Sequence, residues 1–101
     1  QRSQDVLAAN NWNVVQYSIL VHMMAQVSRL VPGELVHVIA DAHIYDRHIP
    51  IVRKLIERPT YDAPEFWINP EITDFYEFKV EDFELRNYKF GPKVENIPIA
   101  V

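Results

Sequence analysis

The sequence predicts an α+β fold in a single domain, and three observations support this. A long apolar run over residues 14–30 has helical spacing, and a second helical pattern covers residues 46–58. Short runs of β-branched or aromatic residues lie at 34–40, 65–68 and 83–85. The order is helix, strand, helix and then short strands, without repeats or a linker, which is typical of α+β domains.

The first predicted helix spans residues 14 to about 30. Apolar side chains recur on one helix face and spread so far around it that we expect a largely buried helix. Asn13 stands directly before it, where an amide can cap the first turn, and Pro32-Gly33 follows its end. His22, within the run, and His37, beyond it, are expected to be core or partly buried histidines.

A buried strand is predicted over residues 34–40, because this short run is rich in β-branched residues. Polar and apolar residues then alternate as far as Tyr45. In an extended backbone this alternation places Asp41, His43 and Tyr45 on one side. Sites are often found at strand ends, and a histidine and a tyrosine there can hydrogen-bond a sugar hydroxyl.

The second helix is predicted from about Asp46 to Arg58. Pro50 falls in its first turn, where proline is tolerated, and Pro59 stops it. Its inward face is expected to consist of three apolar residues: Ile49, Val52 and Ile56.

The remainder of the chain is less regular. Two short strands are predicted at 65–68 and 83–85, and five of the seven prolines lie after residue 58, which favours loops and edge strands. The acidic stretch from Glu77 to Glu84, which includes Asp82, is predicted to be a solvated face from which Phe78 and Phe83 turn inward.

Charge and composition argue against several classes of function. The net charge is -4 and the pI about 5.5, so RNA or other nucleic-acid binding through a basic face is not expected. The longest apolar stretch, residues 19–27, is shorter than the roughly 20 residues that span a bilayer. No signal peptide is visible, so a cytoplasmic location is expected. His43 and His48 are five residues apart, which does not suit two ligands on one helix, and no metal is predicted.

Four polar residues near the start of the chain are candidates for ligand binding. Arg2 and Ser3 set a guanidinium beside a hydroxyl, which suits a phosphate or carboxylate, although an ordinary surface arginine has the same pattern. Asp5 is either an acceptor for a heterocyclic N–H or the cap of a turn. Asn13 is either a helix cap or a reader of a pyrimidine edge, because its amide offers both a donor and an acceptor.

These motifs follow one another in a specific order. The chain reads Gln1-Arg2-Ser3-Gln4-Asp5, Asn13, Asp41-Ala42-His43-Ile44-Tyr45 with His48, Val80-Glu81-Asp82-Phe83 and Ala100-Val101. In this order and spacing it resembles the thymidylate synthase family over essentially its whole length. The resemblance is to the C-terminal part of that family. It implies one domain over residues 1–101, part of a fold in which a mixed β-sheet packs against a long buried helix.

The resemblance implies an activity as well. The family methylates deoxyuridylate (dUMP) to thymidylate (dTMP), and 5,10-methylenetetrahydrofolate supplies both the one-carbon unit and a hydride, leaving as dihydrofolate. A cysteine thiolate adds to the uracil ring and makes the neighbouring carbon nucleophilic. The resemblance further implies a homodimer whose partners are dUMP and folate, with no membrane association.

The same resemblance assigns five residues to the nucleotide. Arg2 is expected to contact the phosphate and to help hold the cysteine, and Ser3 to hydrogen-bond the same phosphate. Asn13 is expected to read the uracil edge. His43 and Tyr45 are expected to hold the ribose hydroxyl.

Two residues are assigned to the folate side. Asp5 is expected to contact the pterin or its ordered water, and the carboxylate of Val101 to close over the ternary complex. The sequence departs from the family pattern nearby, since Ala9 stands where the family usually has Gly and Asn11 where it has Pro. Ala40 likewise replaces a Gly. The loop around Ala9 is therefore expected to differ in its folate contact.

The nucleophile of the family would lie upstream of Gln1, together with its phosphate-binding loop and its proton-shuttling glutamate. The chain reads as though cut from something longer, and its 101 residues contain no cysteine. We therefore expect the isolated chain to be inactive. The alternative function is that of a non-catalytic fragment that binds nucleotide or dimerises.

Overall fold

The computed structural model describes residues 1–99, so the expected role of Val101 lies outside the described residues. The main elements, in chain order, are β1 (Ser3–Asp5), α1 (Asn10–Val27), β2 (Asp41–His43), α2 (Ile49–Ile56), β3 (Glu65–Ile68) and β4 (Phe83–Arg86). Short 3₁₀ turns lie at Asp46–His48, Phe75–Glu77 and Val80–Asp82. The α+β expectation is confirmed.

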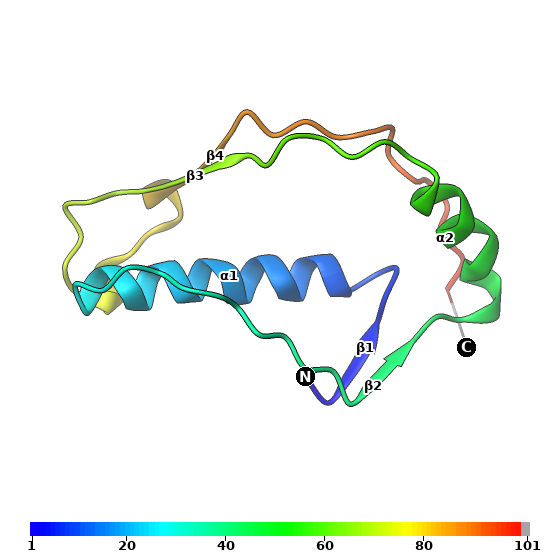
Figure 1. Cartoon of the computed structure of the whole chain (residues 1–101), viewed down its shortest axis with the longest axis horizontal. Helices are drawn as coiled ribbons and strands as arrows, with labels where there is room; N and C mark the ends of the chain where they lie inside the picture. The colour runs from blue at the N-terminus through cyan, green and yellow to red at the C-terminus, as the bar shows by residue number, and fades with distance from the viewer. Residues whose placement is uncertain (100–101) are drawn as a thin grey trace.

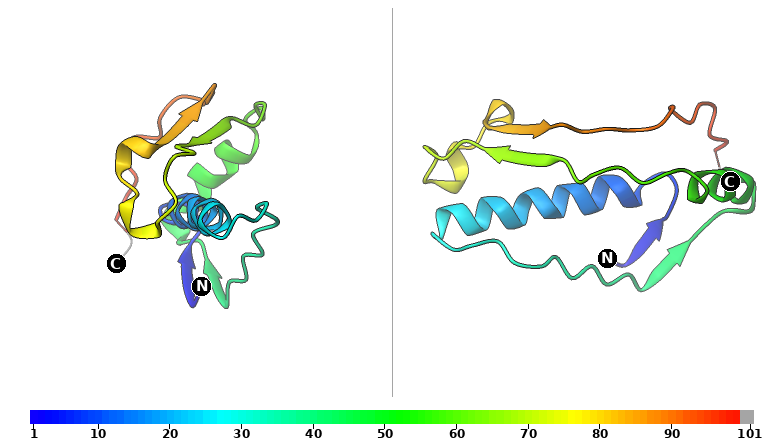
Figure 2. Two further views of the ribbon diagram at one scale, coloured as in Figure 1. Left: turned by 90° about the vertical axis from the view of Figure 1, so that its left-hand side faces the viewer. Right: turned by 45° about the horizontal axis from the view of Figure 1, so that its top comes forward.

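The strands of the described residues form two separate pairs. β1 and β2 are parallel, with Ser3 opposite Asp41 and Asp5 opposite His43, and α1 lies in the connection between them. β3 and β4 are antiparallel neighbours. Figures 1 and 2 show α1 crossing the molecule with the β1–β2 pair on one side and the β3–β4 pair on the other. The helix therefore lies between the two strand pairs.

The start of α1 differs from the prediction. The helix begins at Asn10, and Ala9 occupies the N-cap position without a side-chain hydrogen bond. The interpretation of Asn13 as the cap is therefore wrong, because Asn13 lies inside the first turn. Its side chain instead accepts a hydrogen bond from Gln4 of β1.

The end of α1 follows from backbone geometry. The helix stops at Val27, and Arg29 adopts a left-handed φ of 56°. A residue in this conformation cannot continue an α-helix, and it is a common way for a helix to end. The chain thus leaves the helix before it reaches Pro32-Gly33.

The expectation that α1 is largely buried is wrong. Ala25 is the one buried residue of the helix, while Trp12 is 80% exposed, Val15 56% and Met24 52%. The cause is the open arrangement of the chain. Its radius of gyration is 16.4 Å, compared with about 13 Å for a compact domain of this length. Too few elements of the described chain pack on α1 to cover its apolar faces.

The predicted buried strand at residues 34–40 is also wrong. The segment is not assigned to a strand, and Val36 is 77% exposed. Its backbone meets the first residue of the chain only at its end, where Ala40 N donates to Gln1 O at 3.1 Å. A ladder needs a neighbouring strand, and β1 provides one only from Asp41 onward. The β-branched composition alone therefore did not make this segment a strand.

The second predicted helix is confirmed in its main features. α2 runs from Ile49 to Ile56 with Pro50 in its first turn, and the residues before Ile49 form a 3₁₀ turn. The predicted inward face is wrong for two of its three residues, because Ile49 is 38% and Ile56 76% exposed, while Val52 is half-buried.

The two later strands appear where the pattern placed them, and β4 extends to Arg86. One detail of the acidic stretch is wrong, since Asp82 is 7% exposed and not solvated. Its carboxylate accepts hydrogen bonds from Asn69 Nδ2 at 2.7 Å and Lys79 N at 2.9 Å. Two donors thus compensate for the burial of this charge.

Candidate functional site

The parallel pair of β1 and β2 gathers polar side chains on one face. Because Ser3 lies opposite Asp41, the Ser3 hydroxyl donates to Asp41 Oδ2 at 3.1 Å. The same carboxylate oxygen lies 3.5 Å from His43 Nδ1. Side chains two residues apart in a strand share a face, so this arrangement follows from the alternation in the sequence. Asp41 is thus the common partner of a hydroxyl and an imidazole.

Tyr45 extends this group beyond the end of β2. Its ring stands edge-on to His43, with centroids 5.2 Å apart, and edge-on to His48 at 5.5 Å. Such edge-to-face contacts hold aromatic rings in a defined orientation. The prediction that Asp41, His43 and Tyr45 lie together is confirmed. His43 is half-buried and Tyr45 is exposed, so both remain open to a ligand.

Asp5 occupies the end of β1 and fixes the turn that leads into α1. Its Oδ1 atom accepts hydrogen bonds from the backbone N–H groups of Leu7 at 3.0 Å and Ala8 at 3.1 Å. The alternative that Asp5 caps a turn is thereby confirmed. This geometry leaves its second carboxylate oxygen, Oδ2, without a hydrogen bond among residues 1–99. Asp5 can thus hold the turn through Oδ1 and accept a hydrogen bond from a ligand through Oδ2.

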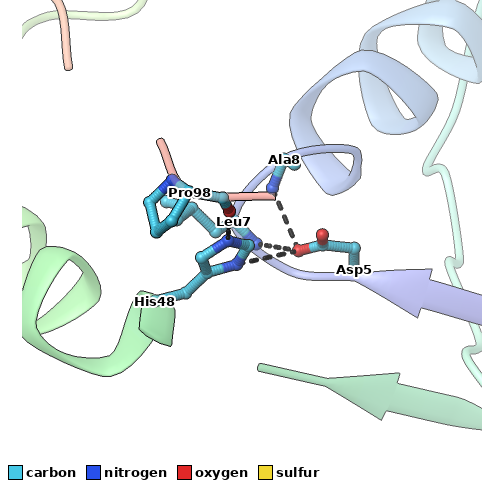
Figure 3. Close-up of polar contacts among 5 residues, drawn as sticks. All are labelled: Asp5, Leu7, Ala8, His48 and Pro98. Atoms are coloured by element: carbon cyan, nitrogen blue, oxygen red, sulfur yellow. Dashed lines mark hydrogen bonds and ion pairs between the residues drawn. The ribbon is translucent and has the colours of Figure 1, made fainter. Parts of the chain in front are cut away.

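His48 lies against Asp5 and joins the tail of the chain to the site. Figure 3 shows its ring between the Asp5 carboxylate and the Pro98 carbonyl. Its Nε2 atom is 2.8 Å from Pro98 O, its Nδ1 atom is 4.0 Å from Asp5 Oδ1, and the residue is 2% exposed. The tail is held further by Arg58, whose Nη1 donates to Pro92 O at 2.8 Å. The tail therefore docks on α2 within reach of Asp5.

Gln4 points away from this face, as strand alternation requires. It is 1% exposed, and its Nε2 atom donates to Asn13 Oδ1 at 2.9 Å. This bond connects β1 to the first turn of α1. Asn13 is half-buried, and it meets β1 through Gln4, on the face opposite to Ser3 and Asp5.

The predicted site residues are not all brought together. Arg2 is exposed and makes no side-chain hydrogen bond or ion pair within the described chain. Two buried residues received no role from sequence reasoning: His48, which contacts Asp5 and Tyr45, and Gln4, which lies on the opposite face of β1. Both belong to recognised motifs, but their importance comes from tertiary partners, Asn13 and Pro98, that the spacing could not reveal.

An apolar cavity lies apart from these residues. A space of about 670 Å³ opens between α1 and the β3–β4 pair. It is lined mainly by apolar side chains, among them Trp12, Ile19, Phe66 and Leu85. Within it the ring of His22 stands 5.0 Å from that of Phe66, as expected for a partly buried histidine. The cavity shares no residue with the polar group on β1 and β2, so we treat it as uncovered core.

The described residues also bear on metal binding and on membrane insertion. Among residues 1–99, no three His, Asp or Glu side chains cluster closely enough to hold a metal ion. Within the same range, no helix combines the length and apolar character that crossing a bilayer requires.

Comparison with known proteins identifies the family. A sequence profile described as "Thymidylate synthase" matches residues 1–101. The chain belongs to the thymidylate synthase family. It is 47% identical over 92% of its length to thymidylate synthase 1 of Bacillus subtilis (strain 168) and 48% identical over the same share to thymidylate synthase of Bacillus phage phi3T. The fold expectation drawn from the resemblance is thereby confirmed at the level of the family.

The structural comparison agrees. Thermostable thymidylate synthase A from Bacillus subtilis superposes with a TM-score of 0.92 and 45% identity over 96% of this chain. The match covers 35% of that enzyme, and the chain spans 33% of each of the two relatives named above. The likeness therefore concerns about a third of a thymidylate synthase.

Proposed function

We propose that this chain is the part of a thymidylate synthase that recognises the nucleotide and the folate. The reaction is the methylation of dUMP to dTMP with 5,10-methylenetetrahydrofolate, which leaves as dihydrofolate. The observation that carries the proposal is the superposition on Bacillus subtilis thymidylate synthase A, in which 96% of this chain follows the enzyme's fold. Residues 1–101 would then form the C-terminal portion of one catalytic domain.

The chemistry of the candidate site suits the nucleotide. Asp41 and Tyr45 orient the imidazole of His43. This imidazole and the phenol of Tyr45 can both hydrogen-bond a ribose hydroxyl. Ser3 is the first residue of β1, and Arg2, whose guanidinium has no partner within residues 1–99, directly precedes it. A guanidinium beside a hydroxyl suits a phosphate dianion. Asn13 supplies the amide that reads the uracil edge. These groups bind and orient dUMP for attack by a thiolate.

The nucleophile has to come from outside these residues. The 101 residues contain no cysteine, so the thiolate that adds to the uracil ring belongs to the rest of the fold. In this proposal Arg2 supports that thiolate, Asp5 contacts the folate, and Val101 closes the ternary complex. We further propose that the whole enzyme is a cytoplasmic homodimer, as is usual in the family.

The test is a chimera in which residues 1–101 replace the matching third of Bacillus subtilis thymidylate synthase A. The chimera should convert dUMP to dTMP with dihydrofolate as co-product, followed by absorbance and by release of tritium from labelled dUMP. The isolated 101-residue chain is the control and should release none, because it has no nucleophile. A chimera that folds and binds dUMP but makes no dTMP would favour the alternative, a non-catalytic nucleotide-binding or dimerising module.

A further inference from the structure

His48 is a buried titratable residue that has no role in the proposed function. It belongs to the 3₁₀ turn before α2 and is 2% exposed. Its ring contacts the Pro98 carbonyl of the tail, the Asp5 carboxylate at the end of β1, and the ring of Tyr45. The imidazole stands between the first two of these groups (Figure 3). His48 is therefore the side chain through which the tail reaches Asp5.

The partners of His48 determine which of its ring nitrogens carries a hydrogen. A backbone carbonyl only accepts, so Nε2, which is 2.8 Å from Pro98 O, must donate. In a neutral imidazole the other nitrogen, Nδ1, then has a lone pair and no hydrogen. That lone pair is buried without a hydrogen-bond partner among residues 1–99, and it faces Asp5 Oδ1 at 4.0 Å. The neutral ring therefore fits this position poorly.

A second proton on the ring removes this conflict. In an imidazolium both nitrogens are donors. Nδ1 then carries a hydrogen within ion-pair distance of Asp5 Oδ1. The bond from Nε2 to Pro98 O becomes charge-assisted, and such bonds are about twice as strong as neutral ones. Histidine side chains change their charge between about pH 5 and 8, so this gain depends on pH.

Asp5 is the charged group that faces Nδ1. Tyr45, on the segment before the turn, stands edge-on to the ring, with centroids 5.5 Å apart. Asp46 and Arg47, the neighbours of His48 on its own turn, are exposed, and water weakens the effect of exposed charges on a buried ring. The carboxylate of Asp5 is therefore the charge that favours a proton on Nδ1.

Two arginines hold the same tail without contacting the imidazole. Arg47 Nη1 donates to Ile99 O at 3.4 Å, and Arg58 Nη1 donates to Pro92 O at 2.8 Å. Arginine remains charged at every pH that a folded protein meets. These two bonds therefore hold the tail independently of pH, and the contact through His48 is the part that responds to pH.

We infer that His48 is a positioning residue for the folate side of the site: as an imidazolium it holds the tail on Asp5, and loss of its proton loosens this contact. The inference rests on the proposed function, because it assumes that Asp5 and the tail meet the folate. The affinity for folate then depends on protonation of His48, whereas the affinity for dUMP, which the proposal assigns to other residues, does not.

The contact is tested in the chimera by hydrogen exchange of the tail. His48→Gln keeps an amide donor that can reach Pro98 O but has no charge at any pH. At about pH 6 the amides of residues 93–99 should exchange about tenfold faster in His48→Gln, the difference between a charged and a neutral hydrogen bond. At about pH 8.5, where imidazole is neutral, the two chimeras should exchange at nearly equal rates. Equal rates at both pH values would overturn the inference.

The effect on folate is tested by steady-state kinetics of the same chimeras. KM for 5,10-methylenetetrahydrofolate should be about tenfold higher in His48→Gln at about pH 6 and nearly equal at about pH 8.5, while KM for dUMP stays the same. Comparison of the two chimeras at each pH cancels the titration of the groups that they share. His22→Gln is the matched control, because this half-buried histidine lies against Phe66, and it should leave both KM values unchanged.

A rise in KM for folate and dUMP together, or a folate KM ratio that is constant with pH, would reduce His48 to a structural role and overturn the inference. The ¹⁵N shifts of the His48 ring in the chimera need no substitution and report the protonation of each nitrogen. A ring that is neutral at about pH 6 while the tail is docked would overturn it as well. Failure of the chimera to bind dUMP would instead contradict the proposed function.

Discussion

At the scale of single residues, the candidate site depends on side chains that orient one another. His43 Nδ1 lies 3.5 Å from the Asp41 carboxylate, and the centroids of the His43 and Tyr45 rings are 5.2 Å apart in an edge-to-face arrangement. Asp5 has two roles, because it holds the turn before α1 and lies 4.0 Å from His48. Substitutions that keep the packing and remove one polar group can therefore separate binding from folding.

Tyr45→Phe removes the hydroxyl and keeps the ring that contacts His43 and His48. In the chimera we expect KM for dUMP to rise about tenfold, the upper range for one neutral hydrogen bond, with the fold unchanged. Steady-state kinetics provide the measurement. Tyr88→Phe, at a tyrosine that is 57% exposed, is the control and should leave KM unchanged. An unchanged KM in Tyr45→Phe would remove the hydroxyl from the nucleotide site.

Asp5→Asn keeps an oxygen that can accept from Leu7 and Ala8 but removes the charge. We expect KM for the folate to rise on the order of tenfold or more, since hydrogen bonds of charged groups are the stronger ones. Asp5→Ala should in addition weaken the start of α1, visible as faster amide exchange at Leu7 and Ala8. Equal folate KM values in wild type and Asp5→Asn would limit Asp5 to its turn. Asp62→Asn in an exposed loop is the matched control.

The predictability of the site differed from residue to residue. The grouping of Asp41, His43 and Tyr45 could be predicted because alternation along a strand is a local property. Gln4 and His48 could not be assigned a role, because their partners lie nine and fifty residues away in the chain. Strand and helix patterns contain no information on such contacts, and only the folded chain reveals them.

At the scale of elements, local patterns succeeded where an element needs no distant partner. β3 matches its predicted residues, and α2 begins where Pro50 can occupy the first turn. The start of α1 was missed because Asp5, and not Asn13, fixes the turn before it. The segment at 34–40 was missed because composition predicts an extended backbone but not the neighbour that makes it a strand.

The connection between β3 and β4 gives a prediction with a defined pH dependence. The hydrogen bond from the Asn69 amide, followed by that from the Lys79 backbone, lowers the pKa of Asp82 below its usual value. A lowered pKa in the folded state contributes stability above the unfolded value of about 3.9, and this contribution is lost as the pH falls through the folded pKa.

Asp82→Asn should therefore destabilise the β3–β4 connection at neutral pH, because one of its two acceptors becomes a donor that faces another donor. The difference in stability from wild type should shrink as the pH falls from about 4 toward the lowered pKa of folded Asp82, because the unfolded chain takes up a proton at Asp82 first. Amide exchange protection of β3 and β4 measures this. Glu81→Gln, at an exposed neighbour, should show no such pH-dependent difference. If the difference in amide exchange protection between wild type and Asp82→Asn is constant with pH, the lowered pKa of Asp82 does not contribute to stability.

At the scale of the whole molecule, the open shape of the chain dominates. The strands and connecting segments of residues 1–99 surround α1 without enclosing it (Figure 1), and the radius of gyration is 16.4 Å. Contiguous exposed apolar surface of this kind promotes association. This chain matches 35% of the Bacillus subtilis enzyme on which it superposes. The remaining part of such a fold can cover the apolar faces of α1, which explains why they are exposed in this chain.

The isolated 101-residue chain should therefore self-associate as its concentration rises, measured by sedimentation velocity. Replacing Trp12 and Met24 of α1 together by Gln should shift the distribution toward the monomer, because it removes two exposed apolar side chains. Lys93→Gln in the exposed tail is the control. A chain that is monomeric at every concentration would show that the exposed apolar faces of α1 do not promote self-association.

The central claim is that β1, β2 and the first turn of α1 form the surface that recognises nucleotide and folate. Its most direct test is hydrogen exchange of the chimera with and without fluorodeoxyuridylate and 5,10-methylenetetrahydrofolate, with intact mass to verify the covalent complex. We predict new protection in residues 3–13 and 41–48 and unchanged exchange in β3 and β4. A covalent complex that leaves residues 3–13 and 41–48 unprotected would contradict the claim.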